Sequence, residues 1–206
     1  MSQQDENRVA VFDINGTLYR KSSKEEFFKF VCFKNGYKLL DIYHVIIYKL
    51  LGKARVINQT QFKENFFNYL NKLEPDTVEQ YAREYWSIEY PRYFNQELLK
   101  RCDELKRDGV KIICITGGLD VYVKPLFELF EADDFYGTNT IYKNGTYLIE
   151  GVACKGEEKL RRLNLHFGQA PYRIVEAYSD EEEPILDEAE KAFLVKSDGS
   201  IHPYHG

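Results

Sequence analysis

An aspartate at the end of an apolar strand is the first group in this sequence that could do chemistry. The segment Val9–Tyr19, VAVFDINGTLY, runs from β-branched and aromatic residues into Asp13, and then into a turn with Gly16 and Thr17. In open α/β sheets the chemistry sits at the carboxyl ends of strands, where Asp13 falls. A carboxylate there can attack phosphorus and form an acyl phosphate, with the Thr17 hydroxyl close to the phosphoryl oxygens. The alternative interpretation is an ordinary turn, because Asp, Asn and Gly are common turn residues.

Three later segments also place reactive or charged groups at the ends of strands or at the start of a helix. Val110–Gly118, VKIICITGG, ends in a hydroxyl and a glycine pair, whose backbone N–H groups can hold phosphoryl oxygens. Cys154–Leu163, CKGEEKLRRL, carries a lysine near a helix start, and Tyr172–Leu186, YRIVEAYSDEEEPIL, is a strand that ends in several acids. Each of them alone is typical of a capped strand or a solvated charged helix. Their order along the chain is what points to a function.

The four segments together resemble the motifs of the haloacid dehalogenase (HAD) superfamily of phosphatases, in its phosphoserine phosphatase-like branch. The first motif of the family is Asp-x-Asp-Gly-Thr-Leu, which Asp13, Gly16, Thr17 and Leu18 match, with Asn15 in place of the second Asp. The resemblance implies that Asp13 is the nucleophile and that it binds Mg²⁺ together with the main-chain carbonyl of Asn15. It also implies impaired activity, because the missing carboxylate acts as acid and base, whereas an amide cannot shuttle a proton.

The resemblance gives the second and third motifs a role in holding the phosphoryl group. Thr116 and Gly117 match the hydroxyl and backbone N–H groups that bind its oxygens, and Gly16 contributes the turn beside them. Lys159 matches the family lysine best, and Lys155 is the second choice. An ammonium group at this place offsets the charge of the nucleophile and of the phosphoryl group.

The fourth motif is expected to complete the magnesium site. Asp180 matches the acid that binds the metal directly, which suits the preference of Mg²⁺ for hard oxygen ligands. The second acid is out of register, because Pro184 comes earlier than in the family pattern. Glu183 or Glu182 is therefore expected to take its place and to hold the metal through water.

Strand patterns predict a parallel, Rossmann-like α/β sheet as the core, built from residues 1–19 and 109–206. Strands are expected to begin near Val9, Val110, Phe135, Tyr172 and Ala192, and the dipeptide Asn144-Gly145 predicts a hairpin that extends the core. Residues 20–108 instead repeat apolar positions with helical spacing, which predicts an inserted all-helical cap. Its helices are expected at about 23–36, 38–51, 58–73 and 77–89, and a helix at 95–107 returns to the core.

Composition narrows the class of protein further. The chain has 206 residues and a net charge of −5, which argues against general nucleic-acid binding. Its four cysteines show no C-x-x-C spacing and are expected to be reduced thiols, and the polar N-terminus carries no secretory signal. These features predict a cytoplasmic protein. The pair His202 and His205 lacks a third ligand and is expected to lie in a solvated tail.

The composition of the predicted cap indicates two candidate classes of substrate. Its segment Tyr37–Arg55 is strongly apolar, which favours a helix in the bundle core over one that makes peripheral contact with a membrane. A small phosphomonoester such as phosphoserine and a lipid phosphate are therefore both candidates. The alternative to a phosphatase is a degenerate HAD domain that binds a phosphorylated ligand or a protein partner without turnover. Asn15 argues for that alternative, unless the residue was introduced to trap a substrate complex.

Overall fold

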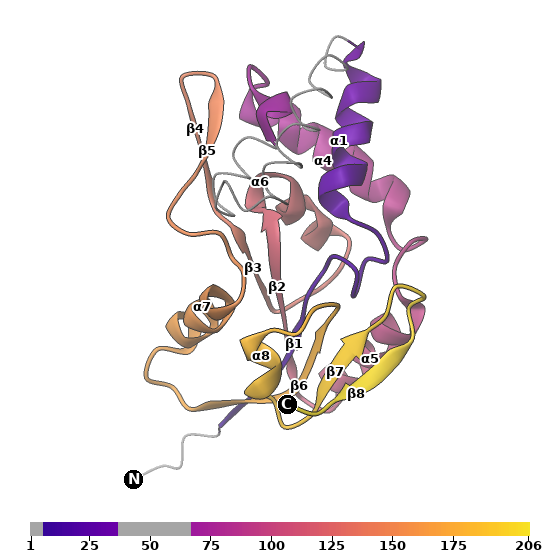
Figure 1. Ribbon diagram of the computed structural model, residues 1–206, viewed down its shortest axis with the longest axis vertical. Coiled ribbons are helices and arrows are strands. Elements are labelled where there is room, and N and C mark those ends of the chain that lie inside the picture. The colour runs from indigo at the N-terminus through magenta and orange to yellow at the C-terminus, as the bar shows by residue number, and fades with distance from the viewer. Residues whose placement is uncertain (1–5, 37–66) are drawn as a thin grey trace.

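A six-stranded sheet forms the centre of the protein (Figure 1). The structure is a computed structural model that describes residues 6–36 and 67–206. All strands of this sheet run parallel except β8, which is antiparallel to its neighbour β7. The predicted parallel α/β core is thus confirmed, with one antiparallel strand added at an edge. In spatial order the strands are β3 (Asp134–Thr138), β2 (Lys111–Leu119), β1 (Asn7–Phe12), β6 (Tyr172–Ser179), β7 (Ala192–Val195) and β8 (Ile201–Tyr204).

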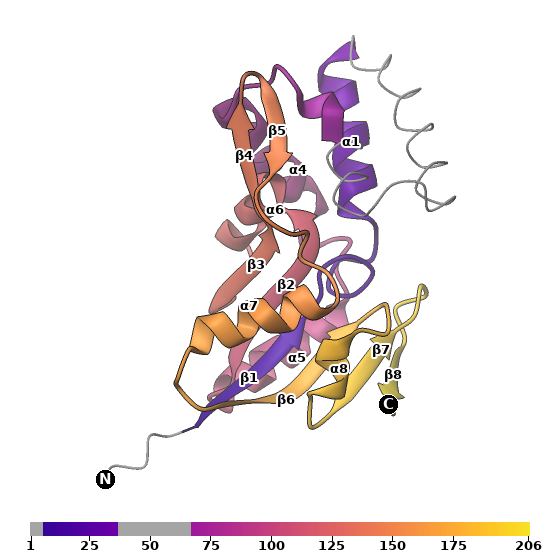
Figure 2. The ribbon, with the colours of Figure 1, turned by 60° about the vertical axis from the view of Figure 1, so that its left-hand side comes forward.

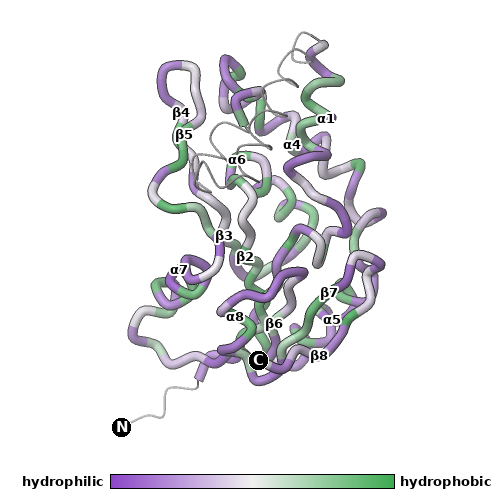
Figure 3. The backbone as a smooth tube through the Cα atoms, in the orientation of Figure 1, coloured by the Kyte–Doolittle hydropathy of each residue, from purple (hydrophilic) through white to green (hydrophobic). Residues whose placement is uncertain are grey.

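The two faces of the sheet bury alternate residues of the same strand, because successive side chains point to opposite faces. Ala10 and Phe12 pack in one cluster with residues of α5 (Gln96–Arg107). Val9 and Val11 pack in a second cluster with residues of α7 (Glu157–Phe167) and α8 (Pro184–Asp187). Figure 2 shows α5 and α7 on opposite sides of the sheet, and Figure 3 shows hydrophobic residues along the central strands. Because helices cover both faces of the sheet, these strands are apolar along most of their length.

The segment predicted as a cap is helical where the structure describes it. It contains α1 (Ser23–Lys34), the short 3₁₀ helix η2 (Phe67–Leu70) and α4 (Pro75–Glu89), and α1 and α4 lie beyond the carboxyl ends of the strands (Figure 1). The helices predicted at 23–36, 77–89 and 95–107 correspond to α1, α4 and α5. The helix predicted at 38–51 lies outside the described residues, as does all of the helix predicted at 58–73 before Phe67.

Helix α4 packs directly against the core that follows β2. The indole Nε1 of Trp86 donates to the carbonyl oxygen of Tyr122 at 2.7 Å, in α6 (Asp120–Val123). Arg83 donates through Nε to both carboxylate oxygens of Glu128 at 3.0 Å, in the 3₁₀ helix η3 (Lys124–Glu128). One hydrophobic cluster continues from the sheet into α1 and α4. The predicted boundary between cap and core stays a prediction.

The chain enters and leaves the inserted segment through two linkers that are hydrogen-bonded to each other. Arg20 N donates to Tyr93 O at 3.0 Å, and Asn95 N donates to Leu18 O at 2.8 Å. The Asn95 side chain also accepts from the backbone at the start of α5, so it caps that helix. These bonds hold the loop that follows Asp13.

The predicted hairpin forms, but it does not extend the central sheet. Strands β4 (Thr140–Lys143) and β5 (Thr146–Ile149) pair only with each other in a separate two-stranded sheet. Asn144 and Gly145 have φ of 53° and 75°, which matches the turn expected for this dipeptide. The hairpin instead contacts the inserted segment, because Lys72 N donates to Gly145 O at 2.8 Å. The hairpin therefore extends the core through Tyr147, which packs in the main hydrophobic cluster, and not by joining the central sheet.

Strand β8 was not predicted, because the tail was expected to be solvated. This strand is only four residues long, is partly exposed and contains Pro203, so no strand pattern marks it in the sequence. Pairing with β7 is what orders the tail, and His202 and His205 remain exposed. All four cysteines are buried, and none of them forms a disulfide. Among the described residues, no helix has the length and apolarity needed to cross a membrane.

Candidate active site

The four sequence motifs meet at the carboxyl ends of β1, β2 and β6. Phe12 pairs with Cys114 on one side and with Tyr178 on the other, so the residues that follow these positions share one edge of the sheet. Asp13 N donates to the carbonyl oxygen of Tyr178 at 2.9 Å, which continues the strand pairing into the site. The register of the parallel strands therefore brings distant parts of the chain together here.

Lys159 is the cation that faces the predicted nucleophile. Its Nζ lies 2.9 Å from Asp13 Oδ2 and also contacts Glu183 Oε2, and its side chain is only 2% exposed. Burial alone lowers the pKa of Lys159, but the charges of Asp13 and Glu183 and their hydrogen bonds outweigh it and raise the pKa above its usual value. The lysine therefore stays protonated between two carboxylates.

Lys155, the second choice for this role, lies elsewhere. Its Nζ is 3.3 Å from Glu181 Oε2, and both side chains are more than one third exposed, at 38% and 63%. The difference follows from the helix start, because Lys155 precedes α7 whereas Lys159 lies in its first turn and on its buried face. Of the two lysines, only Lys159 contacts Asp13 in the structure.

Asp180 lies against the turn of the first motif. A Cβ added to Gly16 would lie 2.2 Å from Asp180 Oδ2, and Gly16 also has a φ of +72°. Glycine is therefore required there both by the backbone and by the close carboxylate. Burial, and then the charge of Asp13, raise the pKa of Asp180 to about 6. Two carboxylates that repel each other in this way favour a cation between them.

The residues present fit a magnesium ion. Asp13 and Asp180 would supply carboxylate oxygens, and the main chain of Asn15, in the same turn, would supply its carbonyl. The described part of the chain holds no cluster of three or more His, Cys, Asp and Glu side chains suited to a metal. A site of two carboxylates, one carbonyl and water suits Mg²⁺, which keeps several waters and uses few protein ligands.

The contacts of Glu183 are not those of a direct metal ligand. It is buried, contacts Lys159, and accepts a hydrogen bond from Ser179 Oγ at 3.2 Å. The shortened turn before Pro184 thus still brings an acid to the lysine. A role for Glu183 in holding the metal through water stays a prediction, and Glu182 is exposed. The contribution of Ser179 was not predicted, although its position at the end of a buried strand could have indicated it.

Asn15 bridges the first motif, the second motif and the inserted segment. Its Nδ2 donates to Thr116 Oγ1 at 3.1 Å, and its Oδ1 accepts from the backbone N–H of Ser23 at 2.8 Å. Thr116 Oγ1 also accepts from Gly118 N at 3.2 Å. Thr17 is fully buried, and its hydroxyl has no partner within the described hydrogen bonds. The part played by Ser23 has no sequence signal, because it is a backbone contact set by the fold.

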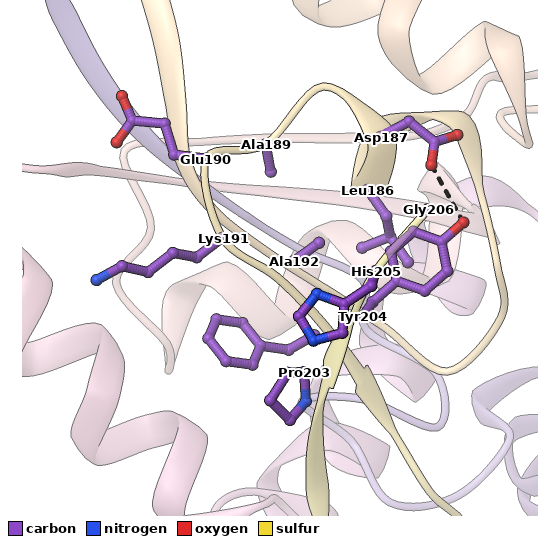
Figure 4. Close-up of a pocket in the computed structure, with 11 residues that line it drawn as sticks. Leu186, Asp187, Ala189, Glu190, Lys191, Ala192, Pro203, Tyr204, His205 and Gly206 are labelled. Atoms are coloured by element: carbon purple, nitrogen blue, oxygen red, sulfur yellow. Dashed lines mark hydrogen bonds between the residues drawn. The ribbon is translucent and has the colours of Figure 1, made fainter.

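A separate hollow of about 530 Å³ lies between α8 and the strands β7 and β8 (Figure 4). Tyr204 closes one side by donating to Asp187 Oδ1 at 3.1 Å. Ala189 and Ala192 lie between that pair and Lys191 (Figure 4). None of the predicted site residues lines this hollow.

Comparisons with known proteins identify a family and several similar folds. The model of the haloacid dehalogenase-like hydrolase family matches residues 10–183. A protein of unknown function from Bordetella pertussis Tohama I is 18% identical with a TM-score of 0.78, covering 91% of this chain and 89% of that one. A phosphoserine phosphohydrolase-like protein from Francisella tularensis is 19% identical with a TM-score of 0.61, covering 91% and 85%. A phospho-aspartyl intermediate analogue of phosphoserine phosphatase is 19% identical with a TM-score of 0.55, covering 91% and 86%.

The family match spans most of the chain, so this protein belongs to the haloacid dehalogenase-like hydrolases. Its fold is that of the phosphoserine phosphatase-like branch, as the sequence motifs predicted. At these identities the structural likeness concerns the fold and not the substrate. No curated protein matches the chain.

The contact between Gly16 and Asp180 gives a prediction with a matched control. Gly16→Ala and Gly109→Ala both add a Cβ at a φ near +72°, but nothing lies within 4 Å of the Cβ at Gly109. We expect Gly109→Ala to lower the free energy of unfolding by about 1 to 2 kcal/mol, the cost of left-handed backbone. Gly16→Ala should cost about 1 to 3 kcal/mol more, because it overpacks the site, and it should weaken Mg²⁺ binding. Urea unfolding and calorimetric Mg²⁺ titration measure both, and equal losses in the two variants would contradict the close packing.

Proposed function

We propose that this protein is a magnesium-dependent phosphatase that hydrolyses a phosphomonoester through an aspartyl-phosphate on Asp13. The observation that carries the proposal is the buried Lys159, whose Nζ lies 2.9 Å from Asp13 Oδ2 at the strand ends. Membership of the hydrolase family supports it. Further support comes from the phosphoserine phosphatase of similar fold that is described as a phospho-aspartyl intermediate analogue.

The first step would form the aspartyl-phosphate. An oxygen of Asp13 attacks phosphorus, the bond from phosphorus to the leaving oxygen breaks, and that oxygen leaves with its electron pair. Asp13 is held for attack because Oδ1 accepts from Ile14 N at 2.6 Å while Oδ2 contacts Lys159. Lys159 and the backbone N–H of Gly117 would stabilise the negative charge on the transferring oxygens. A bound Mg²⁺ would add charge neutralisation at the same oxygens.

The second step would hydrolyse the aspartyl-phosphate. Water attacks phosphorus and gives up a proton, the bond between phosphorus and the Asp13 oxygen breaks, the carboxylate is regenerated, and inorganic phosphate is released. Both steps need a proton carrier, because an alkoxide leaves poorly and water is a weak nucleophile. Asn15 can donate a hydrogen bond but cannot transfer a proton. Turnover of alkyl phosphates should therefore be slow, and aryl phosphates, whose leaving group needs no proton, should react faster in the first step.

The same residue supports a second candidate function. Both ends of the Asn15 side-chain amide are hydrogen-bonded, one to Thr116 and the other to Ser23. A domain that binds a phosphorylated ligand or a protein partner without turnover would keep such a phosphate site and lack the acid and base. The substrate of an active enzyme would be a small phosphomonoester or a lipid phosphate. The apolar segment that motivates the lipid lies outside the described residues.

Substitution of the lysine tests the phosphate site. Lys159→Met should lower kcat/KM for 4-nitrophenyl phosphate by about 10²- to 10³-fold, the usual effect of losing one preorganised charge-stabilising donor. Lys155→Met is the matched control, because its ammonium pairs with Glu181 at the surface, and its activity should stay within about twofold. Circular dichroism should show that both variants fold. Equal activity of wild type and Lys159→Met would rule out the proposed role.

Removal of Asp180 tests the metal site. Asp180→Ala should weaken Mg²⁺ binding by at least roughly tenfold, since even outer partners of a metal site are worth 10- to 100-fold. Glu182→Ala is the control, because that carboxylate is exposed, and its Mg²⁺ affinity should not change. Calorimetric titration of each protein with MgCl₂ makes the comparison. Unchanged binding in Asp180→Ala would mean that the metal assignment of the fourth motif is wrong.

Restoring the missing acid tests the reading of Asn15. General acid–base catalysis is worth about 10²- to 10⁴-fold, so Asn15→Asp should raise kcat for alkyl phosphates by roughly that factor and for aryl phosphates by less. Mg²⁺ affinity should hardly change, because the expected ligand is the main-chain carbonyl. Steady-state assays of both proteins with both substrates provide the measurement. Two inactive proteins would favour the binding domain, and equal activities would mean that another group supplies the proton.

A further inference from the structure

We propose that Asn15 is a positioning residue that holds the Thr116 hydroxyl as a hydrogen-bond donor toward the phosphoryl group. The inference rests on the proposed function, because it needs a phosphoryl group at the strand ends. It assigns the amide a task that a carboxylate in the same place could not perform. In this small network some atoms can donate a hydrogen bond and others can only accept one.

The orientation of the Asn15 amide follows from its partner in α1. The backbone N–H of Ser23 can only donate, so the atom 2.8 Å from it must be the carbonyl oxygen Oδ1. The other end of the amide, Nδ2, therefore faces Thr116 and donates to Oγ1 at 3.1 Å. Ser22, which precedes α1, makes no side-chain capping bond, so Asn15 acts as a distant cap for this helix. The bond with Ser23 thereby fixes the direction of the bond with Thr116.

The oxygen of Thr116 has no room for a third donor. It accepts from Asn15 Nδ2 and from Gly118 N, which occupies both lone pairs of a hydroxyl. Its own proton must then point elsewhere, and no hydrogen bond within the described part of the chain uses it as a donor. Thr116 is fully buried, so bulk water does not provide the acceptor. A buried donor without a partner is costly, and a phosphoryl oxygen at the strand ends would satisfy it.

A carboxylate at position 15 would reverse this bond. It has only acceptors, so it would take the N–H of Ser23 on one oxygen and the O–H of Thr116 on the other. The hydroxyl proton would then be turned toward residue 15 and away from the phosphoryl group. Asn15 therefore cannot transfer a proton, but it fixes the Thr116 hydroxyl as a donor to the bound anion. This favours tight binding of phosphate over rapid turnover.

A double-mutant cycle tests the coupling between these two side chains. The probe is tungstate, a tetrahedral oxyanion, titrated by calorimetry in saturating MgCl₂ against wild type, Asn15→Ala, Thr116→Val and the double variant. Alanine is used at position 15 because aspartate would also repel the anion. We expect Asn15→Ala to weaken tungstate binding by roughly three- to tenfold, about the value of one hydrogen bond. In the Thr116→Val background the same change should have no further effect, because the hydroxyl is gone.

Two further variants distinguish a specific loss of tungstate binding from a general loss of structure. Thr116→Ser keeps the hydroxyl, so it should retain most of the tungstate affinity and the full effect of Asn15→Ala. Thr116→Ala replaces Thr116→Val in the cycle if the valine variant unfolds, as judged by thermal denaturation. An equal loss from Asn15→Ala with and without the hydroxyl would overturn this proposal alone. Wild-type protein that binds no tungstate would overturn the proposed function as well.

Discussion

The buried ammonium of Lys159 is the charge on which the candidate site depends. Asp13 and Glu183 come from different strand ends, and both carboxylates are largely withdrawn from water. Such groups cannot stay ionised together in a protein interior unless a cation lies between them. Lys159 meets this requirement from the first turn of α7, which ties the helix to β1 and β6. The same ion pair orients the carboxylate of Asp13, the proposed nucleophile.

The second carboxylate pair is left without such compensation. Asp180 packs on Gly16 and faces the charge of Asp13, and its pKa is raised first by burial and then by that repulsion. Lysine on one side of Asp13 and an uncompensated acid on the other make the site asymmetric. A phosphoryl group and a divalent cation have complementary charges for these two sides. This asymmetry suits binding of a phosphorylated ligand whether or not the protein turns it over.

Asn15 links the site to the helices above it. A single amide joins the start of α1 to the hydroxyl of the second motif, so the inserted segment and the phosphate site share a hydrogen-bond network. The linkers on either side are bonded to each other, and Trp86 anchors α4 to the core. The loss of the usual acid is therefore accompanied by a defined structural use of its replacement. This is why catalysis and phosphate binding are expected to respond differently to changes at position 15.

From the sequence alone, the parallel α/β core could be predicted, and Asp13 and Lys159 could be chosen as candidate site residues, because strand patterns and motif order are local properties of the chain. The sequence did not reveal β8, whose four residues are ordered only by pairing with β7. Nor did it place the β4–β5 hairpin, which contacts the inserted segment instead of joining the sheet. The partners of Asn15 could not be predicted either, because Ser23 and Thr116 meet its side chain only in the folded chain. Hydrogen-bond direction at Thr116 is decided by donors from Asn15 and Gly118 and by the bond between Ser23 and Asn15, and only the folded chain brings the three segments of Asn15, Ser23 and Thr116 within bonding distance.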